Sequence, residues 1–270
     1  MKPTIPFPTI VLTFACVLWT TSTVPVSWAK EGGNEIPFSE AQLFFELNNT
    51  DSDLGIHASI DGEPWKRLEI EDPNGRKMLK IRANGRLQRQ GMTQLFFESA
   101  EPRFTELTPQ KIFDRFPEGI YEIGGKTLEG NELENEVTLL HVMPAPAEPT
   151  VNALPAAKVC DAEDPGYDAT VTTAPVTISW PAVTTSHPDS NGGGAAVQPP
   201  VPVVIHNYEV VVEVLDQPFA SKLDLILPSG ENFFTIPAEF IALGTNFKYE
   251  VLVREESFNQ TAIESCFVLE

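Results

Sequence analysis

The sequence predicts an all-β protein of two tandem β-sandwiches, and three observations support that prediction. Apolar and polar residues alternate in several short stretches, as in strands that bury one face. The 270 residues include 24 Pro and 17 Gly, which favour many short elements joined by turns. Hydrophobic residues make up 42% and charged residues 21%, a composition that is ordinary for a folded protein. We therefore expect short strands packed into folded domains.

The N-terminal residues 1–29 are predicted to be a signal peptide. Lys2 precedes an apolar run, and Ser27-Trp28-Ala29 provides a cleavage site. The apolar run is shorter than the roughly 20 residues of a membrane span, so we expect no integral membrane segment after cleavage. A transmembrane anchor and a lipoprotein signal acylated at Cys16 are the alternatives. The protein is thus expected to be exported to the periplasm, the cell surface or the medium.

A change in composition divides the rest of the chain. At roughly 150 residues per domain, its length corresponds to between one and two domains, and two modest domains are favoured. Pro and Ala are concentrated from 144 to 157, and an acidic stretch follows, so 144–170 is predicted to be an extended Pro-rich linker. The first domain then covers 36–143 and the second covers 171–270.

The first domain is predicted to be a β-sandwich. Residues 68–71 and 79–82 alternate between apolar and charged side chains, and Asp72-Pro73-Asn74-Gly75 between them has the composition of a hairpin turn with a bulge. This pattern predicts an antiparallel pair of strands. Further strands are expected at 43–47, 55–60, 94–98, 120–123 and 137–142.

One short helix is expected in this domain, over 110–116. Thr108 is a favourable N-cap and Pro109 suits the first helical position. The segment 116–123 follows, with a tight turn and then Tyr121 on an alternating strand. This segment resembles the late strand of bacterial immunoglobulin-like sandwiches.

The second domain has three alternating stretches, at 176–180, 208–214 and 247–253. The first ends in Ser179-Trp180, Tyr208 leads the second, and Leu243-Gly244-Thr245-Asn246 precedes the third. These features resemble a fibronectin type III domain over roughly the last 100 residues. The resemblance implies a seven-stranded sandwich, and such sandwiches carry many unrelated functions.

Two features depart from that family. Phe247 stands where the family has the Tyr of its corner, so the hydrogen bond of the Tyr hydroxyl is expected to be absent. The loop between Trp180 and Tyr208 is longer than the family usually has. It shares a pole of the predicted sandwich with the connection 254–261, whose tip carries Phe258. Phe258 is a candidate anchor for a partner, and the alternative is that it folds back onto the rim.

The cysteines predict one disulfide. Cys16 leaves with the signal peptide, and Cys160 and Cys266 remain. Two thiols in an exported protein favour a bridge, which would attach the end of the linker to the last strand.

The sequence contains no recognisable catalytic motif. Catalytic nucleophile, phosphate-loop and paired-cysteine motifs are absent, and the histidines, at 57, 141, 187 and 206, lack metal-ligand spacing. We therefore expect a non-enzymatic protein without a cofactor. The best metal candidate is a calcium loop at Asn49, Asp51 and Asp53. Leu54 and Ile60 occupy positions where such a loop needs Gly and Glu, so a simple turn is favoured and no metal is expected.

The charge of the chain is strongly acidic. Its 18 basic and 38 acidic residues give a net charge of −20, which argues against nucleic-acid binding and against docking on anionic lipid. Six cations nevertheless fall between positions 76 and 89 with no acid among them, and we name them the basic stripe: Arg76, Lys77, Lys80, Arg82, Arg86 and Arg89.

The basic stripe has two interpretations. It is a candidate contact for an acidic partner, either an anionic polysaccharide or the acidic second domain of a neighbouring copy. The alternative is a solvated sheet face that pairs with Glu69 and Glu71 across the hairpin.

The leading functional hypothesis is an exported binding or interaction protein, an adhesion or scaffold component whose partner is a protein or a polysaccharide. The alternative is a carbohydrate-binding accessory module of a polysaccharide system. Such a module needs an exposed aromatic row, for which Trp65 and Phe258 are the candidates. A hydrolase with an unfamiliar site is the least favoured hypothesis.

Overall fold

The structure, a computed structural model, describes residues 35–188 and 200–270. The described residues belong to one compact unit. The predicted signal peptide lies outside them, and so does the middle of the loop after Trp180, at 189–199. Within the described part of the chain, no helix has the length and apolar character of a membrane span.

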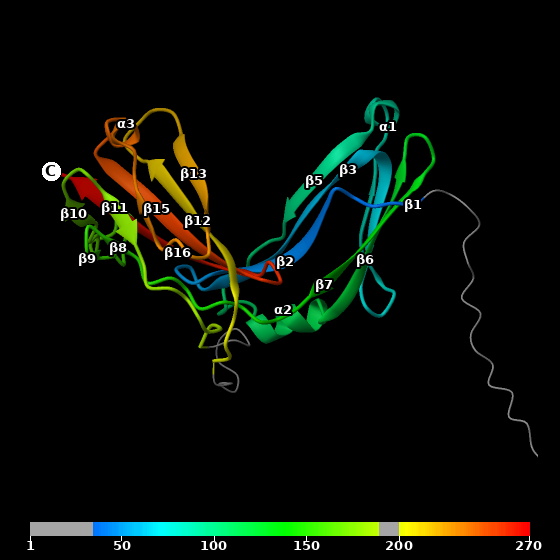
Figure 1. The fold of residues 1–270 in the computed structure, drawn as a ribbon, viewed down its shortest axis with the longest axis horizontal. Coiled ribbons are helices and arrows are strands. Elements are labelled where there is room, and N and C mark those ends of the chain that lie inside the picture. Colours follow the sequence, from blue (N-terminus) through cyan, green and yellow to red (C-terminus); the bar gives the residue numbers. More distant parts are fainter. Residues whose placement is uncertain (1–34, 189–199) are drawn as a thin grey trace, which may run out of the picture. The chain divides into compact units, whose positions relative to one another are not determined.

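The described part of the chain is mostly β, as predicted (Figure 1). Its first elements are β1 Glu35–Ile36, β2 Glu40–Asn48, β3 Asp53–Glu71, β4 Lys77–Arg82, α1 Leu87–Gln90, β5 Met92–Glu98, α2 Pro109–Arg115, β6 Gly119–Thr127 and β7 Glu132–Leu139. The remaining elements are β8 Thr150–Val151, β9 Leu154–Pro155, β10 Thr170–Thr172, β11 Thr177–Ser179, β12 Ile205–Val214, β13 Ser221–Pro228, β14 Phe233–Thr235, α3 Ala238–Ile241, β15 Asn246–Glu255 and β16 Gln260–Leu269.

Two sheets contain all of these strands. The larger has the order β1-β7-β6-β3-β2-β16-β15-β12-β13, with β4 and β5 paired to β3 and β10 paired to β16. The smaller has the order β14-β11-β8-β9. The larger sheet is continuous because β16 pairs in parallel with β2, from Gln260 opposite Glu46 to Ala262 opposite Asn48 (Figure 1). Early and late parts of the chain therefore share one sheet.

The strand β3 replaces two of the predicted strands. The expected strands at 55–60 and 68–71 are both parts of β3. The strand continues through register shifts between Asp61 and Trp65 and between Trp65 and Arg67. Bulges of this kind bend and twist a strand without ending it. The predicted hairpin to β4 is present, and Gly75 at its turn has a φ of 70°.

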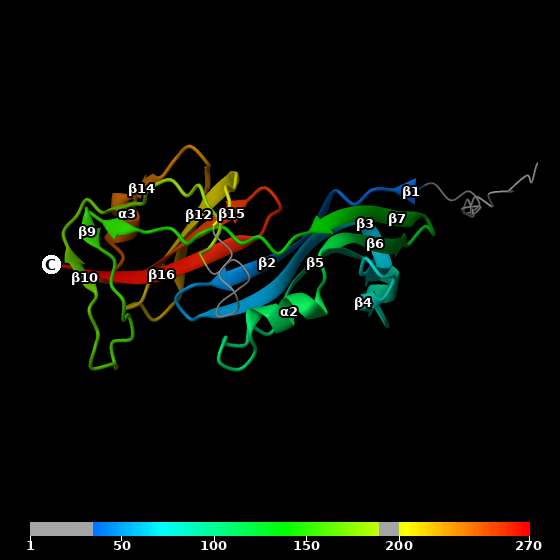
Figure 2. The same ribbon diagram turned by 90° about the horizontal axis from the view of Figure 1, so that it is seen from below.

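The predicted helix is α2 (Figure 2), and its buried Ile112 and Phe113 belong to a first hydrophobic core made mainly by residues of β2, β3, β6 and β7. Its Phe113 meets Phe45 of β2 edge to face, with ring centroids 5.1 Å apart. Thr108 holds the N-cap position, but its side chain makes no capping hydrogen bond. After the helix, the Tyr121 hydroxyl donates a 3.0 Å hydrogen bond to the carbonyl of Pro117. This bond fixes the turn that leads into β6.

A second hydrophobic core lies among the later strands. Trp180 packs against Tyr208 with ring centroids 5.3 Å apart, and Phe247 stacks on Phe267 at 4.8 Å. Phe247 is fully buried and has no hydroxyl, so the corner hydrogen bond is absent as expected. The two cores contain different residues although they share the larger sheet. The division into two independently folding domains stays a prediction.

The segment 144–170 differs from the extended linker that its composition predicts. Val151 of β8 is fully buried in the second core and pairs with Ile178 of β11. Ala147 is also buried there. The sequence pattern missed this contact because one apolar side chain between prolines creates no periodicity.

The disulfide is present as predicted. Cys160 and Cys266 are bonded, with their Cα atoms 5.7 Å apart. The bridge attaches the segment before β10 to β16, and β10 pairs in parallel with the end of β16. The C-terminal strand is therefore held by covalent and main-chain bonds together.

Candidate functional site: a basic pocket

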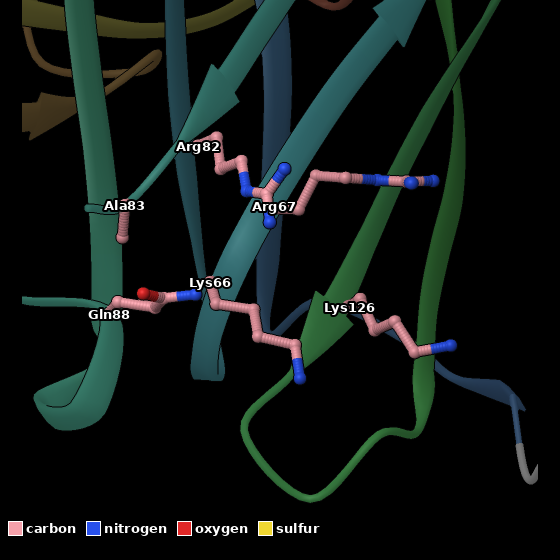
Figure 3. A pocket seen from close by; sticks show the side chains of 6 residues that line it. All are labelled: Lys66, Arg67, Arg82, Ala83, Gln88 and Lys126. Carbon is pink, nitrogen blue, oxygen red and sulfur yellow. The ribbon is translucent and has the colours of Figure 1, made fainter. Parts of the chain in front are cut away.

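A pocket beside β3 is lined mainly by cations. Its volume is about 290 Å³, close to the lower end of about 300–1,000 Å³ for small-molecule sites. Figure 3 shows the six residues that line it, which we name the basic pocket: Lys66, Arg67, Arg82, Ala83, Gln88 and Lys126. Four of the six are Lys or Arg, in a chain whose net charge is −20.

Strand pairing aligns three of these cations. Arg67 lies on β3, directly opposite Arg82 of β4 on one side and Lys126 of β6 on the other. Directly opposite residues share a face of the sheet and have Cβ atoms about 4.5–5.5 Å apart, and like charges in such pairs are destabilising. The fold therefore places three positive charges in a row, of which Arg67 and Lys126 also lie beside the carboxylates of Glu69 and Glu132.

A bulge adds the fourth cation. Between Trp65 and Arg67, β3 advances two residues while β6 moves one, from Thr127 to Lys126. Lys66 is the additional residue, and bulges often redirect a side chain in this way. Fully buried Trp65 anchors the bulge, and the carbonyl of Lys66 accepts a 2.9 Å hydrogen bond from the backbone N–H of Ala83.

Nearby carboxylates are already engaged by other cations. Glu69 contacts Lys77, approaches Lys80 Nζ at 2.6 Å and lies 3.4 Å from Arg67 Nε. The hydrogen bonds from Lys77 and Lys80 lower the pKa of Glu69 to about 2, so it stays ionised.

Within the part of the chain that the structure describes, two cations of the pocket have no carboxylate partner. Glu132 pairs with Lys126 at 2.7 Å. Lys66 and Arg82 form no ion pair with any carboxylate within the described ranges 35–188 and 200–270.

The structure divides the basic stripe between its two interpretations. Arg82 lines the basic pocket, whereas Lys77 and Lys80 bind Glu69 across the hairpin. The remaining three members lie outside the pocket lining: Arg76 in the hairpin turn, and Arg86 and Arg89 at α1.

The sequence pattern does not predict three cations of the pocket: Lys66, Arg67 and Lys126. Their meeting depends on which strands pair and on the position of one bulge. The adjacent pair Lys66-Arg67 before an alternating strand was the available signal.

The aromatic candidates are both covered to some degree. Trp65 is fully buried, so it cannot stack on a sugar. Phe258 is half-buried and its ring lies 5.2 Å from that of His206, which matches the alternative that it folds back onto the rim. An exposed aromatic row built on these two residues is therefore excluded.

The candidate calcium loop forms a turn between β2 and β3. The side-chain carbonyl of Asn48 accepts hydrogen bonds from the backbone N–H groups of Thr50 and Asp51. Asn49 Oδ1 lies 3.0 Å from His187 Nε2, in hydrogen-bond contact with it. The segment thus has the local bonds of an ordinary polar turn, and calcium binding here stays a hypothesis.

Comparison with known proteins gives remote structural likenesses. No protein-family model matches the chain, and no curated protein matches its sequence. It is similar to the FN1–FN3 domains of chicken CNTN1, with 8% identity and a TM-score of 0.30 over 88% of this chain and 66% of that one. A two-domain fibronectin type III segment of chicken tenascin gives 9% identity and a TM-score of 0.27. This match covers 86% of this chain and 98% of that one.

A tetra-tandem repeat from the extending region of a large adhesion protein gives 11% identity and a TM-score of 0.26. That match covers 86% of this chain and 50% of the other. The chain thus spans about two thirds of the CNTN1 fragment and half of the adhesion fragment.

Proposed function

We propose that the protein is an exported, non-enzymatic interaction protein, an adhesion or scaffold component of two β-sandwich modules at 36–143 and 171–270. Its basic pocket would hold an anionic group of the partner. The observation that carries this proposal is the row in which Arg67 lies between Arg82 and Lys126.

The chemistry of the row supports an anionic ligand. Like charges held opposite one another destabilise the free protein, and a bound anion would relieve that repulsion. Guanidinium groups bind carboxylate, sulfate and phosphate through two parallel hydrogen bonds. Arg67 and Arg82 are both exposed, so their contribution to binding is screened by salt. We therefore expect a ligand that repeats its charge along a polymer.

The partner class that best fits is an acidic polysaccharide. The pocket has room for one anionic group and lies on a sheet surface, where a chain can run across it. The other candidate, a carbohydrate-binding accessory module that stacks sugars, is favoured less because Trp65 is buried. An acidic protein surface, including that of a second copy, would present the same carboxylates.

The test compares anionic and neutral polymers. The full chain is titrated with polygalacturonate, dextran sulfate and neutral dextran by calorimetry at 20 mM and 300 mM NaCl. We expect binding to an anionic polymer that weakens at the higher salt, and a loss of at least tenfold in the Arg67→Gln/Arg82→Gln double variant. The matched control, Arg86→Gln/Arg89→Gln, removes the same charge outside the pocket and should bind as the wild type does.

Three results would overturn the proposal. One is binding of neutral dextran as tightly as of the anionic polymers. The second is equal affinity in the two double variants. The third is no binding of any anionic polymer. Binding that depends on the pocket but is reproduced by an acidic peptide and not by a polysaccharide would change the partner class to protein.

A further inference from the structure

We propose that His57, Glu98 and Glu101 form a binding site for a divalent metal of the zinc type. These three residues offer ligand atoms that all lie within 4.8 Å of one another. The site is separate from the basic pocket and does not depend on the function proposed above.

The fold brings the three residues together across one pair of strands. His57 of β3 lies directly opposite Glu98 of β5. Glu101 follows three residues later and returns over β3 beside Gly55. A side chain at position 55 would collide with the carboxylate of Glu101. Glycine at this position therefore leaves the space that Glu101 occupies.

Two of the ligand atoms are close to the separation that zinc needs. His57 Nε2 and Glu101 Oε1 are 2.8 Å apart, in hydrogen-bond contact. Two ligands at about 2.1 Å from a tetrahedral zinc ion are separated by roughly 3.4 Å, so zinc would replace this hydrogen bond after a small outward movement of the Glu101 carboxylate. Glu98 is exposed, so its carboxylate is free to complete the set. The remaining coordination positions would be open to water or to a partner.

A second observation supports the site, on the opposite side of the imidazole ring. Glu46 Oε2 lies 3.7 Å from His57 Nδ1, and Glu46 itself accepts a hydrogen bond from Gln260. Metal-binding histidines usually turn their second nitrogen toward a carboxylate, which fixes the tautomer and orients the ring. His57 is only 4% exposed, so its neighbours restrict the movement of the ring.

The surrounding charges favour a cation at this position. Carboxylates lie near both ring nitrogens of His57: Glu101 Oε1 is 2.8 Å from Nε2, and Glu46 Oε2 is 3.7 Å from Nδ1. A divalent ion on Nε2 would be held by the ring together with the carboxylates of Glu98 and Glu101.

The donor set selects the class of metal. One imidazole nitrogen and two carboxylates suit zinc and other divalent transition metals. Calcium prefers a set made of oxygen atoms alone. We therefore expect zinc to bind here and calcium not to bind.

The experiment uses the full chain, purified without a histidine tag and freed of metal with EDTA. Calorimetric titration with zinc should show one saturable site per chain, and titration with calcium should show none there. Glu98→Gln should weaken zinc binding at least tenfold, and Glu101→Gln should do the same. Glu106→Gln, which removes an exposed carboxylate from the same segment, is the matched control and should bind zinc as the wild type does.

Two measurements keep the result interpretable. Melting temperatures of the metal-free variants separate lost ligands from lost folding, and exposed Glu98 is the position that can change without unfolding. A shift of the His57 ring signals in NMR spectra on zinc addition should accompany binding. The proposal is overturned if no saturable zinc site is found, or if Glu98→Gln and Glu106→Gln bind zinc equally well.

Discussion

The side-chain carbonyl of Asn259 accepts a 2.8 Å hydrogen bond from the backbone N–H of Phe45, more than two hundred positions earlier in the chain. The amide of Asn259 also donates hydrogen bonds of 2.8 Å and 2.9 Å to the carbonyls of Leu140 and Val142. Asn259 is completely buried between β15 and β16. One side chain therefore links the β15–β16 turn to β2 and to the segment after β7.

Replacement of Asn259 by Ala should destabilise the protein by about 3 kcal/mol. The change leaves one N–H and two carbonyls without their partners in a buried place, and each unpaired group costs roughly 1–3 kcal/mol. Urea unfolding measures the change in free energy. Asn74→Ala in the exposed hairpin turn is the control and should change stability by less than about 0.5 kcal/mol. A loss below about 1 kcal/mol for Asn259→Ala would contradict the role given to this residue.

Replacement of Arg82 by Gln should stabilise the free protein while weakening anion binding. The change removes one like-charge pair of the row, and such cross-strand pairs contribute roughly 0.2–1 kcal/mol. We expect a gain of about 0.5 kcal/mol at low salt, measured by urea unfolding, and a smaller gain at 0.5 M NaCl because salt screens the repulsion. Arg89→Gln makes the same change of charge outside the pocket. An equal gain in both variants would mean that net charge, and not the row, is responsible.

The stability of the protein should fall as the pH rises toward 8, because of Glu250. Burial, with the charges of Glu46 and Glu264 adding to it, raises the pKa of this carboxyl from 4.5 to about 8. The folded chain then binds the proton more tightly than the unfolded chain does. The resulting stabilisation is full below about pH 4.5 and is lost as the pH rises through about 8.

Glu250→Gln should remove this dependence. At pH 9 the variant should be more stable than the wild type by about 2 kcal/mol, since it no longer buries a charge. Urea unfolding at pH values from 5 to 9 measures the difference. Glu231→Gln, at an exposed turn, is the control. Parallel pH profiles for the wild type and Glu250→Gln would show that another group governs this range.

Local patterns predicted the elements whose causes are local. The hairpin at Asp72–Gly75 follows from turn chemistry, and α2 follows from Thr108-Pro109 and the residues after them. Tyr121 makes its hydrogen bond to a carbonyl only four residues earlier. The disulfide follows from simple counting, because Cys160 and Cys266 are the two cysteines outside the predicted signal peptide.

The order of the strands and the composition of the candidate sites depend on long-range pairing. Parallel pairing of β16 with β2 joins residues more than two hundred positions apart, and no local pattern encodes that choice. The same limit applies to the candidate sites. Arg67 meets Lys126, and His57 meets Glu98, because particular strands are neighbours and in a particular register. A single sequence shows alternation within a strand but does not show which strand lies beside it.

The bonds on both edges of β16 have a mechanical consequence. Residues Asn246 to Arg254 of β15 pair with one edge of β16. β2 and β10 pair with parts of its other edge. Tension applied at Glu270 would pull β16 along its own axis, so many main-chain hydrogen bonds would share the load and would have to break together. Survival under load is governed by the unfolding rate and not by equilibrium stability. We therefore expect β16 to unfold slowly under tension applied at this end.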